Sequence, residues 1–287
     1  MKYSPHQFAL WRILFGIYLL FYLSRTLPYA AELFSAKGVM PNASDNWTYG
    51  LFPNVLYYYD SVFFINIFLV IMILLAACFT LGFFRRTSSF ILWYGWVCLF
   101  NRNNFTEDPV LPYTGWLILA CALIPAGEPF SFPFKAKKQK WHMPKVIYYG
   151  AWLILGLSYT VTGIEKLFAP SWKNGMAMKI IYETSIAWNW PVTNFMKSMP
   201  LIFLKLQTWI AVALQVTSLP LYLFRKTRFW AWILMVGMHI LTLLTLNIVQ
   251  VSFGILLFHL FVADYSWLSK TPVYSKLLNT ARKISVK

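Results

Sequence analysis

The sequence predicts an all-α protein, a polytopic bundle of about eight transmembrane helices with both termini in the cytoplasm. Of its 287 residues, 59% are hydrophobic and 12% are charged, whereas about a quarter of a soluble domain is charged. The mean hydropathy is +0.57. One soluble domain of this length cannot bury so much apolar surface, so the composition indicates a protein that lies in a lipid bilayer.

The apolar residues form stretches that suit a membrane, because about 20 of them in a helix cross a hydrocarbon core of about 30 Å. We expect spans over residues 8–23, 62–84, 88–99, 111–125, 146–167, 201–224, 229–246 and 248–262. The third and fourth are short and could be tilted or re-entrant. We treat residues 1–268 as one transmembrane domain. Residues 269–287 form a basic cytoplasmic tail, for which we expect a short amphipathic helix on the inner leaflet.

The basic residues report the orientation of these spans. A net charge of +16 would indicate nucleic acid in a soluble protein. Here the cations cluster between apolar stretches, so we expect no nucleic-acid partner. If the N-terminus is cytoplasmic, every inside segment is basic, as the positive-inside rule requires. The long segments 24–61 and 168–200 then face outward. We expect a multi-pass protein of a bacterial inner membrane.

The sequence lacks the motifs of the common hydrolases, nucleotide-dependent enzymes and zinc enzymes. The three cysteines lie in apolar stretches without a CxxC pair or metal spacing. No Walker loop, dinucleotide fingerprint, nucleophile elbow or zinc motif occurs. We therefore expect no metal, and the hydrolase and nucleotide-dependent classes have no support. A transporter is not favoured either, because no inverted repeat is visible.

Lys166 follows Glu165 at the outer end of the fifth stretch. A charge at the centre of a membrane helix costs about 2.5–3.5 kcal/mol, so each one raises a functional question. Lys166 is either an ordinary helix-end lysine that snorkels to the interface, or a lysine in a partly apolar pocket that acts as a neutral base. Adjacent helix residues point to different faces, so Glu165 need not neutralise Lys166.

Arg12 lies one turn into the first stretch. It either snorkels to the inner face or ties helices together as a structural polar group, with Gly16 permitting a close approach of two helices. His239 and His259 lie in the last two stretches, where a membrane histidine is more often a hydrogen-bonded structural residue than a ligand.

Amides cluster in two outer turns. Asn103 and Asn104 lie in the turn at residues 101–104, and Asn247 lies in the last tight turn. Polar groups at this level either cap short helices or line an outward-facing cavity.

Three segments resemble one known family. They are the run of residues 8–16 with its aromatic-Arg-x-Leu-x-Gly pattern, the run 163–167 followed by Trp172 and Gly175, and Met238-His239 with Gly254. Together they resemble the vitamin K-dependent gamma-carboxylase family and its bacterial relatives, the horizontally transferred transmembrane (HTTM) domain. The resemblance covers nearly the whole chain.

The resemblance implies an activity, with Lys166 as the base that deprotonates a reduced quinone of the vitamin K type. Oxygen then oxidises the quinol, and CO2 adds to a glutamate in the carboxylases. The expected pocket lies at the outer membrane face, with Lys166 as its catalytic residue. The candidate lining residues are Glu165, Trp172, Asn103, Asn104, His239 and Asn247.

Two differences from the carboxylases keep a second function open. Phe105 follows Asn103 and Asn104, where the carboxylase has a histidine, and the large lumenal peptide-binding domain has no counterpart. Glu165 is more similar to the membrane component of the sporulation-delaying toxin maturation system. The alternatives to a lyase or oxidoreductase are therefore a maturation factor for a small secreted peptide, acting with a soluble periplasmic or lumenal partner, or a non-catalytic protein that binds a quinone or lipid.

Overall fold

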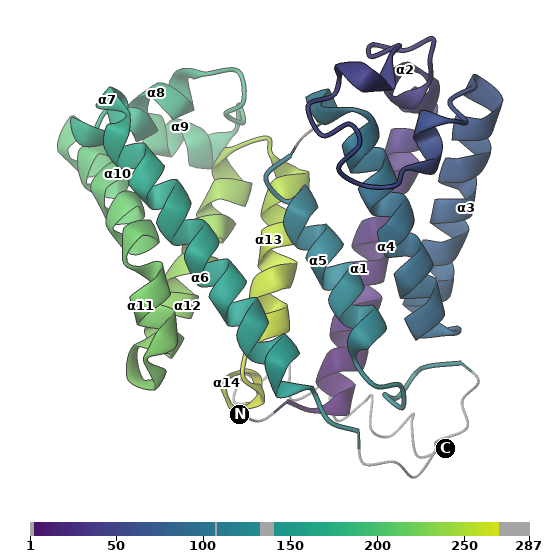
Figure 1. The fold of residues 1–287 in the computed structure, drawn as a ribbon. Coiled ribbons are helices and arrows are strands. Elements are labelled where there is room, and N and C mark those ends of the chain that lie inside the picture. Colours follow the sequence, from purple (N-terminus) through teal and green to yellow (C-terminus); the bar gives the residue numbers. More distant parts are fainter. Residues whose placement is uncertain (1–2, 107, 133–140, 270–287) are drawn as a thin grey trace. The chain divides into compact units, whose positions relative to one another are not determined.

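The protein is all-helical, as predicted, in a computed structural model that describes residues 3–106, 108–132 and 141–269 (Figure 1). Among these residues β-pairing is limited to one isolated bridge, between Ala187 and Leu246. Every predicted apolar stretch is helical. The helices are α1 (Pro5–Thr26), α3 (Val62–Leu81), α4 (Arg85–Arg102), α5 (Leu111–Leu123), α6 (Lys145–Phe168), α10 (Leu201–Val216), α11 (Ser218–Leu223), α12 (Arg225–Thr245) and α13 (Val249–Val262).

Short helices connect the long ones. They are η1 (Leu27–Tyr29), α2 (Ala30–Phe34), η2 (Ala43–Asp45), η3 (Val55–Tyr57), η4 (Asn104–Thr106), α7 (Pro170–Lys173), α8 (Ala177–Glu183), α9 (Pro191–Ser198) and α14 (Tyr265–Leu268). Among the described helices, four segments are long and apolar enough to cross a membrane, and a fifth qualifies if α9 and α10, bent by 107°, form one broken span. The count of eight spans and the cytoplasmic position of both ends remain predictions. Residues 270–287, which hold nearly all of the expected amphipathic tail helix, and the basic residues at 135–140 lie outside the described residues.

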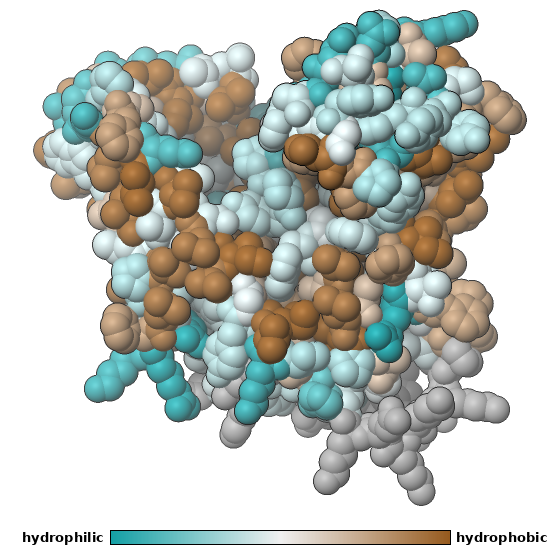
Figure 2. Space-filling view, viewed as in Figure 1, coloured by the Kyte–Doolittle hydropathy of each residue, from teal (hydrophilic) through white to brown (hydrophobic). Residues whose placement is uncertain are grey.

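The chain divides into two compact units. Unit 1 comprises residues 1–144 and 263–287, and unit 2 comprises residues 145–262. Each unit exposes apolar side chains on its long helices, for example Phe63 and Leu74 of α3 in unit 1 and Ile202 and Ile210 of α10 in unit 2. Figure 2 shows hydrophobic residues along the middle of the helices and hydrophilic residues toward the helix ends. This distribution suits helices surrounded by lipid.

Local sequence signals explain where the helices begin and end. The hydroxyl of Ser4 accepts the amide of Gln7 and caps α1, and Pro5 supplies the first turn. α3 ends at Gly82, which adopts a left-handed φ of 71°. The stretch at 201–224, predicted as one helix, is interrupted at Thr217, and α11 restarts with Pro220 in its first turn. Proline lacks the amide that a continuous helix would need there.

A buried cluster of charges joins α1, α4 and the segment after α5 in unit 1. Nε of Arg85 donates to Glu128 at 2.6 Å, and its terminal nitrogens donate to carbonyls of Cys121, Ile124 and Pro125. Nη1 of Arg12 lies 3.8 Å from the same carboxylate. Arg12 also donates to the Phe130 carbonyl at 2.6 Å. Arg12 therefore ties α1 to a distant segment as a fully buried group.

The opposite end of unit 1 is held by hydrogen bonds between side chains and backbone. Asn46 donates to the Asn101 carbonyl at 2.7 Å, and Asn54 donates to the Cys98 carbonyl at 2.8 Å. Arg102 is fully buried and donates to the Met40 carbonyl at 2.9 Å. The long segment between α2 and α3 is thus fixed against the C-terminal end of α4.

Candidate functional site

Lys166 lies in the last turn of α6, in unit 2. Its Nζ is 5.1 Å from the centroid of the Trp172 ring and 3.5 Å from the Thr162 carbonyl. The side chain is partly buried, whereas that of Glu165 is exposed. Within the described residues, Lys166 makes no ion pair closer than 4.0 Å. The ammonium group is therefore balanced by an aromatic face and a carbonyl rather than by a carboxylate.

Two glycines of the same motif shape this end of α6. A Cβ on Gly163 would lie 2.6 Å from the backbone nitrogen of Val216, so only glycine allows α6 and α10 to approach this closely. Gly175 has φ +80° and is pressed against Lys205 and Trp209. The indole nitrogen of Trp209 donates to the Lys173 carbonyl at 3.1 Å. These contacts hold α7, and with it Trp172, next to Lys166.

We expect Gly163→Ala to lower the free energy of unfolding by about 1–3 kcal/mol, because the added methyl group forces α10 away from α6. A matched control is Gly237→Ala in α12, where a Cβ meets no atom within 4 Å. That change should stabilise the helix by up to about 1 kcal/mol. Thermal unfolding of both variants in detergent compares the two effects. Equal stabilities would show that the glycine contact with α10 is unimportant.

The turn between α12 and α13 lies at the same end of unit 2 (Figure 1), and Asn247 belongs to this turn. The backbone amide of Asn247 donates to the Ile186 carbonyl at 2.6 Å, and the residue is exposed. The amide of Trp188 donates to the Thr245 carbonyl at 2.9 Å. The segment between α8 and α9 is therefore fixed to the α12–α13 turn, and Asn247 contributes backbone rather than a buried amide side chain.

His239 forms part of a buried network in the core of unit 2. The hydroxyl of Tyr159 in α6 lies 2.6 Å from Nε2 of His239 in α12 and 2.8 Å from Nε2 of His259 in α13. Tyr159 and His239 are at most 8% exposed, and His259 is fully buried. Tyr159 precedes Lys166 by seven residues and so lies on nearly the same face of α6, about 10 Å away along the helix axis.

Asn103 and Asn104 belong to unit 1. The Asn103 side chain is fully buried, donates to the Leu33 carbonyl at 2.6 Å and accepts the Phe105 amide at 2.9 Å. These bonds make Asn103 a brace between α2 and η4. The Oδ1 atom of Asn104 is buried and has no hydrogen-bond partner among the described residues.

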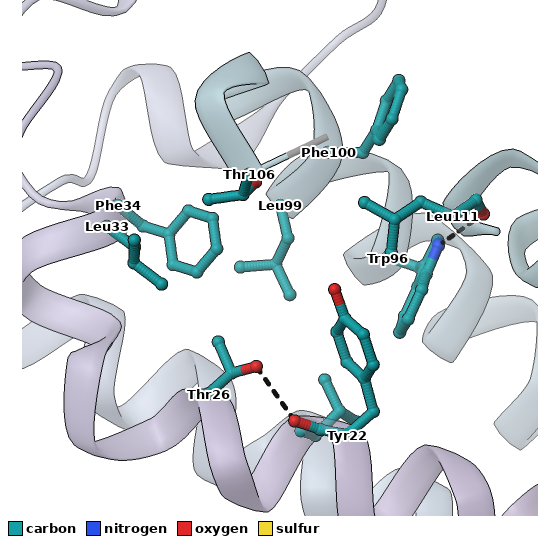
Figure 3. Close-up of a pocket in the computed structure, with 10 residues that line it drawn as sticks. Tyr22, Thr26, Leu33, Phe34, Trp96, Leu99, Phe100, Thr106 and Leu111 are labelled. Carbon is teal, nitrogen blue, oxygen red and sulfur yellow. Dashed lines mark hydrogen bonds between the residues drawn. The ribbon is translucent and has the colours of Figure 1, made fainter. Parts of the chain in front are cut away.

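A cavity of about 70 Å³ lies beside this turn, within unit 1 (Figure 3). Its walls are mainly aromatic and aliphatic, formed by Tyr22, Leu23, Thr26, Leu33, Phe34, Trp96, Leu99, Phe100, Thr106 and Leu111. The polar groups on Thr26 and Trp96 are used in bonds to the carbonyls of Tyr22 and Leu111. Between η4 and α5, burial raises the pKa of the Asp108 carboxyl above its usual value. The cavity was not predicted, because its lining shows no sequence periodicity.

The candidate residues thus fall into two sets. Lys166, Glu165, Trp172, His239 and Asn247 belong to unit 2, and Arg12, Asn103 and Asn104 belong to unit 1. Among these candidate residues, the side chains of Lys166 and Trp172 are in direct contact. No group of three or more potential metal ligands occurs in the part of the chain that the structure describes. Tyr159 and its pairing with His259 were missed, since hydrogen bonds across three helices leave no local pattern.

Several apolar helices of spanning length define the chain as a multi-pass integral membrane protein. The family model of the HTTM domain matches residues 2–267. The chain therefore belongs to the HTTM family, as the sequence resemblance predicted. Comparison with curated proteins and with solved structures gives no match.

Proposed function

We propose that the protein is a membrane enzyme of the vitamin K-dependent carboxylase type, in which Lys166 is the general base for a lipid-soluble quinol. Oxygen would be the oxidant, with CO2 as a further substrate if the reaction continues to carboxylation. The observation that carries the proposal is Lys166 itself, a partly buried amine over the Trp172 ring and without an ion-pair partner among the described residues. Membership of the HTTM family supports it.

Trp172 has a defined task in this proposal. A lysine that takes a proton from a quinol hydroxyl becomes a cation, and the face of an indole ring stabilises a cation within about 6 Å. The ring is 5.1 Å away, so it lowers the free energy of the protonated product state. Glu165 forms no ion pair with the Lys166 amine within 4.0 Å, so the amine stays available for the hydroxyl group.

The residues at this site also fit an aromatic ligand. Trp172 offers a ring for stacking, and the Lys166 amine offers one group able to exchange a proton with a phenolic hydroxyl. A bound quinol supplies the electrons for the reduction of oxygen. The protein's own residues bind and orient the ring, hold the abstracted proton on Nζ of Lys166, and stabilise the resulting charge.

Purified protein in lipid nanodiscs, supplied with reduced naphthoquinol, oxygen and labelled bicarbonate, tests the class of function. We expect quinol consumption that requires oxygen and exceeds the rate in empty nanodiscs. Incorporation of label into a glutamate-containing peptide would extend the activity to carboxylation. Quinol consumption no faster than in empty nanodiscs would refute the enzyme proposal, and saturable quinone binding in that case would establish a non-catalytic binding protein.

A second candidate is a maturation factor for a small secreted peptide in a bacterial inner membrane. The observation that favours it is the exposed apolar surface around α9, where Trp190, Val192 and Phe195 are 38–60% exposed. Such a surface suits a peptide or a soluble partner. A photoreactive group at position 195 should then cross-link a co-expressed secreted peptide in intact cells. Cross-links to lipid alone would exclude this function for α9.

A further inference from the structure

The Tyr159, His239 and His259 side chains form a hydrogen-bonded chain whose direction can be deduced. One phenol lies within 2.8 Å of two imidazole nitrogens. A tyrosine hydroxyl has one proton, so it donates to one imidazole and accepts from the other. One histidine therefore has its proton on Nε2, and the other has a bare Nε2 and its proton on Nδ1.

The second nitrogen of His259 decides between the two directions. Nδ1 of His259 is buried and has no hydrogen-bond partner among the described residues. The described residues offer Nδ1 no acceptor, and a buried N–H without an acceptor is rarer and more costly than a bare lone pair. The proton of His259 is therefore placed on Nε2, which donates to Tyr159, and a water molecule that reaches Nδ1 does so as a donor. Tyr159 then donates to Nε2 of His239, whose own proton is on Nδ1.

A second polar atom on α13 is buried in the same way as Nδ1 of His259. The hydroxyl of Ser252 is buried and, within the described part of the chain, also lacks a partner. Ser252 precedes His259 by seven residues, so both side chains lie on nearly the same face of α13. Buried polar atoms without protein partners mark places where ordered water completes the hydrogen bonding.

We propose that Tyr159, His239 and His259 form a buried proton relay that begins at water bound to Nδ1 of His259. A proton that reaches Nδ1 of His259 releases the proton on its Nε2 to the Tyr159 oxygen. The original Tyr159 proton passes to Nε2 of His239, and the proton on Nδ1 of His239 leaves. Each group keeps its number of protons, and no electron moves.

After this passage the two hydrogen bonds of the network point in the opposite direction. Passage of one proton in reverse restores the starting state, so the relay carries one proton out and one back in each cycle. General acid–base reactions require such paired transfers. Histidine chains inside membrane proteins commonly have this role. The relay does not depend on the reaction proposed for Lys166.

Nitrogen NMR of the full-length protein in nanodiscs, with labelled histidine, tests the relay. We expect His259 protonated on Nε2, His239 protonated on Nδ1, and magnetisation transfer from water to Nδ1 of His259. Tyr159→Phe removes only the hydroxyl and should slow proton exchange at His239 by a factor on the order of 10². The signals are assigned with His239→Gln.

Tyr222→Phe is the matched control, because Tyr222 is a fully buried phenol of the same unit without a hydrogen-bond partner among the described residues. It should leave both histidine signals unchanged. Protonation of His259 on Nδ1, or no water contact there, would overturn the relay in favour of a purely structural clamp. If Tyr159→Phe does not fold, the tautomer of His259 and its water contact in the wild-type protein still decide between the relay and the clamp. Lys166→Met should greatly slow the reaction proposed for Lys166 and leave the histidine spectra unchanged. The relay and the Lys166 reaction can therefore fail independently of each other.

Discussion

Replacing Glu128 with glutamine should lower the free energy of unfolding by about 3–5 kcal/mol, the usual cost of removing one partner from a buried ion pair. Arg12, Arg85 and Glu128 are all at most 4% exposed. The carboxylate accepts from Arg85 at 2.6 Å and lies 3.8 Å from Arg12. Without its charge, two guanidinium groups remain buried and repel each other. Chemical denaturation in detergent micelles, followed by tryptophan fluorescence, measures the loss.

The matched control for this prediction is Glu183→Gln. Glu183 faces Lys179 at 4.0 Å on α8, and the two side chains are 61% and 43% exposed, respectively. Such pairs contribute about 0–1 kcal/mol, so the control should unfold almost like the wild type. If Glu128→Gln also unfolds like the wild type, the cluster does not hold α1 to α4 and the segment that follows α5.

Replacing Lys166 with methionine should reduce quinol turnover by a factor of about 10²–10⁴, the usual contribution of a general base. Methionine keeps the length and apolar character of the lysine stem, so it removes the amine with little change in packing. The measurement is the rate of quinol consumption in nanodiscs under saturating oxygen. Lys166→Arg should be similarly slow, because a guanidinium group stays protonated and cannot accept a proton.

Lys173→Met is the control for that experiment. Lys173 lies seven residues further along, in α7, and is exposed. Its replacement should leave the turnover of quinol within about twofold, as expected of a surface change away from the site. Comparable rates in Lys166→Met and Lys173→Met would remove Lys166 from the reaction.

The positions of the helices follow from the sequence, because the hydropathy of each segment can be read from that segment alone. Every predicted apolar stretch is largely helical, and the long segments at 24–61 and 168–200 carry most of the short helices. α4 is longer than the apolar stretch at 88–99 because its ends bind buried partners through Arg85 and Arg102. Those partners lie far along the chain, so the pairing of Arg85 with Glu128 was not predictable from local spacing.

The candidate site was predicted only in part. The motif that contains Lys166 and Trp172 is local, and the structure places these two side chains in contact. The Tyr159 network joins three helices, and its direction depends on a buried nitrogen of His259 that no sequence pattern reveals. Asn103 was predicted as a possible pocket residue, but both ends of its side chain are bonded to backbone. Satisfaction of hydrogen bonds is visible only in three dimensions.

The place where a quinol binds can be measured by photocross-linking with a light-activated naphthoquinone analogue, followed by peptide mapping. If the quinol reacts at the C-terminal end of α6, we expect adducts on the segment from Lys166 to Trp172 and their loss when excess unlabelled quinone competes. Competable adducts confined to the unit 1 cavity, on Tyr22, Phe34 or Trp96, would contradict this expectation and place the ligand elsewhere.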